Sequence, residues 1–292
     1  MKIGIVTVTY NSRSVLEDFF ASLERQTYAN HALYIVDSGS TDDTVVYVQA
    51  HLPERCTFLQ NAENIGFAAG TNQGIRAAFQ DGCMAILALN NDVVFGPELL
   101  ERLVEALDQY KCDMTTPMMY YHEPKDRIWA AGGSLQPWLG YRNKHRGEGK
   151  TDHGQYSVAC RVTFAPLCCV LIRKDVFDRV GLLDERYFTY TEDVDFMYCC
   201  LKQGLSLWYV PEAKLWHKVS SLTGNMSDFM VRYCTRNRVY FLRKHMPYLL
   251  ALLWYWQLQA RSALAYLLRR KTLSKWKLRR VAAKEGWDMK QR

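Results

Sequence analysis

Apolar and polar positions alternate in a regular order along the first 110 residues. Four short apolar runs have the length of buried strands: 2–8, 32–37, 56–61 and 84–89. Four segments with the periodicity of an amphipathic helix follow them in turn: 12–25, 43–50, 66–80 and 97–109. Repeated β-α units of this spacing predict an α/β, doubly wound, mostly parallel sheet with helices on both faces.

The pattern changes after residue 110. A segment rich in Gly, Lys and Arg at about 139–155 is long enough to predict a mobile cover over an active site. Further elements are predicted in three places: a strand and a helix within 162–177, a helix at 191–203 that Gly204 closes, and a strand at 206–216. Everything from about Asp228 onward has a helical pattern. We therefore expect an α/β body at 1–227, with halves of about 1–110 and 111–227, and a helical extension at 228–292.

Charge is distributed unevenly between these two parts. Residues 232–292 hold 16 Lys and Arg against two acids, a net charge of +14, whereas the first 231 residues carry a net charge of −7. Such a basic segment faces anionic lipid or nucleic acid, or is a solvated helical surface. We expect no nucleic-acid partner, because the basic residues lie outside the α/β body and no nucleic-acid motif is present.

The extension has the composition of a helix at a surface. Its longest apolar run, Tyr248–Trp256, is nine residues, against the roughly 20 that a membrane span needs. Five apolar residues share one helix face: Leu249, Leu253, Trp256, Leu264 and Leu267. Two interpretations stay open. One is peripheral membrane contact through 247–284, and the other is packing on the body or on a second copy in a homodimer.

The cysteines and the first residues fit an intracellular protein. The nine cysteines are odd in number and form no CxxC pair, so we expect reduced, buried thiols. The start MKIGIVTVTYNS lacks the basic region, the long apolar run and the cleavage site of a signal peptide. We expect a cytoplasmic protein, with the inner face of the cytoplasmic membrane as an alternative place.

Polar side chains follow each of the first four predicted strands, at the edge where open α/β sheets bind ligands. They fall in four groups: Thr9, Tyr10 and Asn11; Asp37 to Ser40; 61–66; and Asn90, Asn91 and Asp92. Helix caps and Asx turns explain each group singly, but four groups at one edge favour a binding site. The glycines 66, 70 and 74 lie on one helix face, which fits either close packing on the sheet or a binding cleft.

Several of these residues carry candidate chemistry. Asp92 is a candidate carboxylate ligand for Mg²⁺ or Mn²⁺, with waters and substrate phosphates completing the coordination of the cation. Glu192, Asp193 and Asp195 crowd the first turn of a helix, which complements the macrodipole or raises one carboxyl pKa and makes it a usable base. His217, after a strand, is either structural or a nitrogen ligand of the same cation.

Seven stretches carry a resemblance to the inverting, metal-dependent family 2 glycosyltransferases with the GT-A fold. They occur in the family's order over about residues 3–240: VTYNS, VDSGSTDDT, NIGFAAGTNQGI, LNNDV, YTEDVDF, LWHKVSS and RYCTRNR. The chain looks most like the rhamnosyltransferase branch that builds bacterial surface polysaccharides. By this resemblance, the half at 1–110 would bind the nucleotide sugar and the half at 111–227 the acceptor.

The resemblance also implies a role for each position. It implies a nucleotide-binding set: Thr9, Tyr10, Asn11, Asp37, Ser38, Asn64, Gly66, Asn72 and Asn91. Asp92 and His217 would hold the metal, with Asn90 standing where many members have a further acid. Asp193 would be the catalytic base, with Glu192 as its neighbour. The expected contacts to the acceptor or the diphosphate come from three residues: Asp195, Arg236 and Asn237.

The implied function is transfer of a sugar, with rhamnose as one candidate, from a dTDP- or UDP-sugar to a glycan or lipid-linked acceptor. A single carboxylate base with no second nucleophilic carboxylate predicts one displacement with inversion. Asn90 leaves a second interpretation open, because a site with fewer charges also fits a catalytically weak nucleotide- or glycan-binding module of the same fold.

Overall fold

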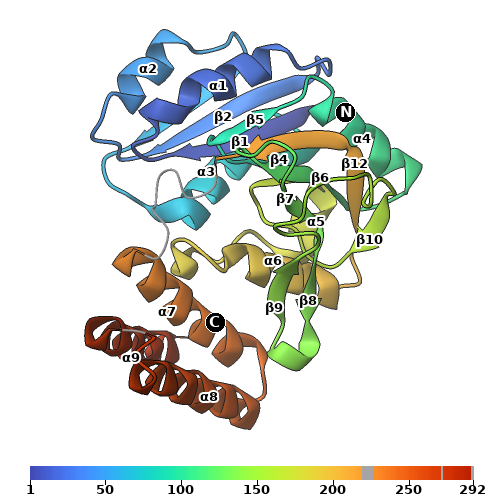
Figure 1. Ribbon diagram of the computed structural model, residues 1–292. Helices are drawn as coiled ribbons and strands as arrows, with labels where there is room; N and C mark the ends of the chain where they lie inside the picture. Colours follow the sequence, from blue (N-terminus) through green and yellow to red (C-terminus); the bar gives the residue numbers. More distant parts are fainter. Residues whose placement is uncertain (219–226, 271, 291–292) are drawn as a thin grey trace.

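A central, mostly parallel sheet organises the protein. The computed structural model describes residues 1–218, 227–270 and 272–290 (Figure 1). The strand order is β10-β12-β6-β11-β4-β1-β2-β3, with β5 added on β12 and β7 on β6. The bounds are β1 (Ile3–Thr9), β2 (His31–Ser38), β3 (Cys56–Asn61), β4 (Ala85–Leu89), β5 (Val93–Phe95), β6 (Met114–Tyr121), β7 (Ile128–Ala131), β10 (Cys160–Val162), β11 (Cys169–Arg173) and β12 (Leu207–His217).

Helices cover both faces of this sheet, as the alternating pattern predicts. The helices of the body are α1 (Arg13–Glu24), α2 (Thr44–Ala50), α3 (Gly66–Gln80), α4 (Leu99–Gln109), α5 (Lys174–Val180) and α6 (Glu192–Lys202). Phe19 of α1 and Leu103 of α4 lie in one core cluster, while Ile75 of α3 and Phe196 of α6 lie in the other. The two clusters are separated by the sheet, so the doubly wound α/β class is confirmed.

The sheet is parallel from β4 through β1 and β2 to β3, and mixed in the middle. β1 pairs in parallel with β2 and β4, and β2 pairs in parallel with β3. β11 runs antiparallel between β4 and β6, and β12 is again parallel to β6. The carboxyl ends of β1, β2 and β4 therefore share one edge, where the predicted polar groups lie.

Two of the three spaced glycines of α3 serve close packing on the sheet. A Cβ on Gly70 would lie 3.0 Å from Val8, and one on Gly74 would lie 2.5 Å from Val6. Real Cβ atoms do not approach so closely, so α3 rests on β1 only because side chains are missing there. The packing interpretation of these two positions is confirmed.

The segment at 139–155, for which the sequence predicts a mobile cover, contains a strand. It contains β9 (Arg142–His145), which pairs antiparallel with β8 (Gly133–Gln136) through a short 3₁₀ turn at Pro137–Leu139. The sequence does not predict this hairpin, because β9 has the sequence Arg-Asn-Lys-His and so lacks the alternation of apolar and polar residues that identifies a strand. Figure 1 shows the hairpin extending from the sheet toward the C-terminal helices.

Three helices follow the body: α7 (Asp228–His245), α8 (Tyr248–Leu267) and α9 (Leu273–Asp288). Tyr240 and Phe241 of α7 are fully buried in the core cluster that also holds α3 and α6. Leu253 and Trp256 of α8 are exposed instead, at 68% and 61%. No helix in the described part of the chain is long and apolar enough to cross a membrane. All nine cysteines are free thiols; five are buried, as expected, and four are partly exposed: Cys56, Cys160, Cys199 and Cys234.

Candidate active site

The ends of β1 and β2 form a hydrogen-bonded cradle around Asp37. Thr9 donates its hydroxyl to Asp37 Oδ1 at 2.9 Å, and Ser40 donates its hydroxyl and its backbone N–H to the two carboxylate oxygens at 2.6 and 2.9 Å. Asn11, at a positive φ of 50°, accepts from the N–H of Thr41 at 2.8 Å. Asp37 is fully buried, whereas Tyr10 is 45% exposed beside it. The cradle fixes this corner and leaves the Tyr10 ring open to a ligand.

Three further residues of the expected nucleotide-binding set are joined by hydrogen bonds: Ser38, Asn64 and Gly66. Ser38 donates to Asn64 Oδ1 at 3.1 Å, and that same oxygen accepts the N–H of Gly66 at 2.9 Å. Gly66 has φ +82°, and a Cβ there would lie 2.5 Å from the ring of Phe188. Only glycine fits this conformation and this approach, so the start of α3 and the segment around Phe188 are held together.

Asn72 lies elsewhere. Its amide donates to the carbonyl of Leu183 and to Glu185, both at 2.9 Å, and accepts the N–H of Leu183 at 3.0 Å. The side chain is buried and its polar atoms are taken up by these contacts. Asn72 therefore ties α3 to the segment before α6, which is a scaffolding task, and offers no polar atom to a nucleotide.

Asp92 and His217 meet across the antiparallel pair of β5 and β12. His217 Nε2 lies 3.2 Å from Asp92 Oδ1, and both side chains are buried. Asn91, next to Asp92, donates to the carbonyl of Val8 at 2.8 Å and so joins the ends of β4 and β1. Two predicted metal ligands that are distant in sequence are thus adjacent. The later residues of LWHKVSS, 219–221, lie outside the described residues.

The pair fits a divalent cation. Carboxylate oxygen and imidazole nitrogen each bind such ions at about 2.1 Å, so two ligands at a right angle stand about 3 Å apart. The observed 3.2 Å matches this spacing. Burial lowers the pKa of His217, but Cys168 and the Asp92 carboxylate more than offset it, so the net direction is upward. Asp92 and His217 are the residues that would hold Mg²⁺ or Mn²⁺.

A pair of acids stands at the start of α6. Glu192 is buried, and its Oε2 has no hydrogen-bond partner among the described residues, while Asp193 is partly exposed and accepts the N–H of Val194 at 2.7 Å. Burial raises the pKa of both carboxyl groups, and the charge of Asp193 raises that of Glu192 further. The pair therefore holds a proton to higher pH than ordinary carboxyls do, and Asp193 is the member that can reach a substrate.

The segment before this pair has an unusual backbone. Phe188, Tyr190 and Thr191 all have positive φ, at 65°, 65° and 74°. Non-glycine residues adopt this region at a cost of about 1 kcal/mol or more each, so surrounding contacts must hold them there. The carbonyl of Phe188 accepts the N–H of Ala68 at 3.2 Å, which places the segment, and hence the start of α6, at the carboxyl edge of the sheet.

Arg236 and Asn237 of α7 supply the remaining contacts to this segment. Asn237 is fully buried and donates its amide to the carbonyls of Tyr187, Thr189 and Tyr190 at 2.9, 2.7 and 2.7 Å. Arg236 donates to Asn237 Oδ1 and to the carbonyls of residues 186 and 187, each at 2.8 Å. The RYCTRNR motif therefore supports the loop that presents Asp193, where the sequence suggests a direct contact to substrate.

Asp195 likewise has structural partners. It accepts from Tyr187 at 2.9 Å and from Lys244 at 2.8 Å, and it lies 2.6 Å from His245 Nε2. With Cys199 and His245 it also forms a group of three potential metal-binding atoms. Because the ammonium of Lys244 already neutralises the carboxylate, we interpret this group as the ion-paired attachment of α7 to α6.

Trp129 is a site residue that the sequence does not reveal. Its ring stands edge-on to His217, with centroids 4.4 Å apart, and edge-on to His145 at 4.9 Å. The only signal is an aromatic residue in a short strand, which is ordinary in any core.

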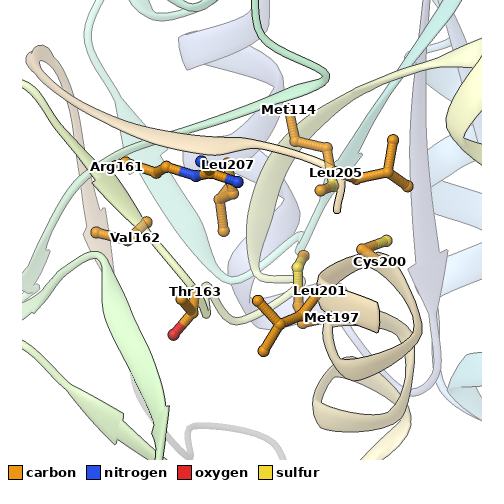
Figure 2. Close-up of a pocket in the computed structure, with 9 residues that line it drawn as sticks. All are labelled: Met114, Arg161, Val162, Thr163, Met197, Cys200, Leu201, Leu205 and Leu207. Carbon is orange, nitrogen blue, oxygen red and sulfur yellow. The ribbon is translucent and has the colours of Figure 1, made fainter. Parts of the chain in front are cut away.

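The cavity drawn in Figure 2, between Met114, Arg161 and Leu205, has a volume of about 20 Å³ and holds no more than a water.

The fold is that of the GT-A glycosyltransferases. Two solved structures align with nearly the whole chain at 14% identity. GalNAc-T7 with UDP, GalNAc and Mn²⁺ has a TM-score of 0.64 over 96% of this chain and 55% of that one. The mannosyltransferase PcManGT from Pyrobaculum calidifontis, in complex with GDP-Man and Mn²⁺, has a TM-score of 0.61 over 98% and 84%.

The family follows from the sequence match. The model described as Glycosyl transferase family 2 matches residues 4–181, and the chain belongs to this family of glycosyltransferases. Among its relatives is the N-acetylglucosaminyl-diphospho-decaprenol L-rhamnosyltransferase of Mycobacterium tuberculosis, 25% identical over 97% of both chains. The dTDP-rhamnosyl transferase RfbF of Shigella flexneri is 24% identical over 85% of this chain and 82% of its own.

Proposed function

We propose that the protein transfers a sugar, with inversion, from a pyrimidine nucleotide sugar to a hydroxyl of a lipid-linked glycan in the synthesis of a bacterial surface polysaccharide. The observation that supports this most strongly is the meeting of Asp92 and His217 at 3.2 Å on the carboxyl edge of the sheet. The activities of the two related rhamnosyltransferases make L-rhamnose and a dTDP donor the first candidates.

The residues of the site divide the chemistry between them. The Asp37 corner, with the open Tyr10 ring, receives the base and ribose. Asp92 and His217 would hold Mg²⁺ or Mn²⁺, and such a cation would supply positive charge to the diphosphate leaving group. Asp193 accepts the proton of the acceptor hydroxyl as that hydroxyl attacks the anomeric carbon from the opposite face. Glu192, kept protonated by burial, limits the negative charge beside the base.

The first experiment is thermal unfolding with dTDP, UDP, GDP and ADP, each with and without Mn²⁺. A ligand at 100 times its dissociation constant stabilises the fold by about 2.7 kcal/mol, which is readily measured. We expect a shift with dTDP or UDP that grows with Mn²⁺ and is lost in Asp92→Ala. A shift that is equal with and without Mn²⁺ in both proteins would contradict the metal assignment.

A lipid-linked acceptor lies in a membrane, and the exposed face of α8 is suited to contact that membrane. Leu249, Leu253, Trp256, Leu264 and Leu267 are each more than half exposed, and no acid occurs between 229 and 284. An apolar stripe with basic neighbours suits an anionic bilayer surface. We place the enzyme at the inner face of the cytoplasmic membrane, as a peripheral protein.

A further inference from the structure

The hairpin β8–β9 borders a large basic cavity that the donor site does not use. The cavity has a volume of about 750 Å³, within the range of ligand sites. Four cationic side chains line it, against one acid, Glu148: Lys144, Arg146, Lys150 and Arg161. None of the four forms an ion pair with an acid in the part of the chain that the structure describes. Uncompensated cations around a hollow indicate an anionic ligand.

Tyrosine rings and a thiol hold one of these cations in place. The guanidinium of Arg146 lies 4.7 Å from the ring of Tyr156 and 5.6 Å from that of Tyr209, and it donates to Cys160 Sγ at 3.1 Å. These neighbours orient Arg146 without neutralising it. A planar guanidinium held in this way is suited to bind phosphate oxygens in pairs.

The cavity begins close to the reaction centre. His145, which lines it, is in ring contact with Trp129, and Trp129 is in ring contact with His217. Only the Trp129 ring separates the two imidazoles. Two ring contacts therefore connect the lining of the cavity to the pair of Asp92 and His217. An acceptor whose phosphate is held in the cavity can direct its sugar toward this pair.

The other end of the hairpin leads to apolar surface. The hairpin strands are four residues each, so the turn lies about 13 Å from the cavity end. Trp138 in that turn is 73% exposed. The turn is fixed to the C-terminal helices, since Arg238 donates to the carbonyl of Leu139 at 2.7 Å and Gly140 lies against Trp254 of α8. An apolar chain leaving the cavity along the hairpin would reach the exposed face of α8.

From this arrangement we infer that the cavity under β8–β9 binds the diphosphate of a prenyl-diphosphate-linked acceptor, with the sugar toward Trp129 and the prenyl chain toward Trp138. The inference rests on the proposed function, because it assigns a place to that reaction's acceptor. Inorganic diphosphate has the same anionic groups, but it has no apolar chain that could contact the apolar surface along the hairpin.

Geranyl diphosphate and inorganic pyrophosphate are suitable probes, titrated calorimetrically at low salt. We expect geranyl diphosphate to bind the parent protein at least as tightly as pyrophosphate does. The double variant Lys144→Glu/Lys150→Glu changes two exposed residues and should weaken geranyl diphosphate at least tenfold. Arg25→Glu, a charge reversal at another exposed residue, directly after α1, should stay within twofold of the parent, and so should Asp92→Ala.

Three outcomes would overturn the inference: no binding of geranyl diphosphate to the parent, tighter binding of pyrophosphate, or parent-like binding by the double variant. Loss of binding in Asp92→Ala would also overturn it, because the diphosphate would then occupy the donor site. Arg161→Gln, with an intact melting curve, repeats the test if the double variant unfolds. Nucleotide binding, measured on the parent and on the Lys144→Glu/Lys150→Glu variant, fails only if the proposed function itself is wrong.

Discussion

Removing the Asn237 amide tests whether α7 positions the catalytic base. In Asn237→Ala the carbonyls of Thr189 and Tyr190 lose the Asn237 amide as donor, the carbonyl of Tyr187 keeps only Arg236, and Arg236 loses one acceptor. A buried hydrogen bond contributes about 1 kcal/mol net, and a buried carbonyl left unpaired costs about 1–3 kcal/mol. The summed loss is about 3 kcal/mol, which lowers the melting temperature by about 6 °C or more in a chain of this size.

The larger effect should fall on turnover. Without Asn237 the positive-φ residues of the loop can relax, and Asp193 moves with them. A displacement of about 1 Å at a reacting group costs about 100-fold in rate. We therefore expect kcat to fall about 100-fold while KM for the donor changes less than threefold. The assay is release of the nucleoside diphosphate from the donor that the thermal-shift series identifies.

Asn72→Ala is the matched control. It removes the same side chain from a comparable set of buried hydrogen bonds, but these bonds hold Leu183 and Glu185 and do not reach the loop at 187–190. The two variants should lose similar stability, whereas only Asn237→Ala should lose most of its kcat. Equal losses of kcat in both, or an unchanged kcat in folded Asn237→Ala, would refute the positioning role.

Further predictions concern the base, the metal and the membrane. Asp193→Asn should keep nucleotide binding and lose at least 100-fold in kcat, and turnover within a few-fold of the parent would reject Asp193 as the base. Because the folded state raises the pKa of the Glu192 and Asp193 carboxyls, kcat should rise with pH through a range above that of ordinary carboxyls, and the pair's contribution to stability should fall over the same range. Asp92→Ala should abolish the Mn²⁺ dependence of nucleotide affinity, measured by titration. Leu253→Asp/Trp256→Asp should no longer sediment with anionic vesicles, and parent-like sedimentation would leave α8 without a lipid-facing role.

The sequence by itself determined the fold class and most of the strand-end chemistry. Alternation with period 2 and 3.6 depends on local side-chain order, so the β-α units of the first 110 residues were predictable. The edge where Asp37 and Asp92 lie was predictable too, because parallel strands bring their carboxyl ends together. The hairpin β8–β9 was not predictable, because its two strands are only four residues long and mostly polar.

Tertiary structure alone decided what several residues do. Glu192, Asp193 and Asp195 look equivalent in sequence. In the described part of the chain, Asp195 contacts Lys244 and His245, Glu192 is buried with no hydrogen bond to its Oε2, and Asp193 is partly exposed. Which carboxylate is paired depends on a helix that comes some 50 residues later, and no local pattern encodes that contact. The same holds for Asn237, because burial and long-range hydrogen bonds, not residue type, decide whether an amide touches a substrate or supports a loop.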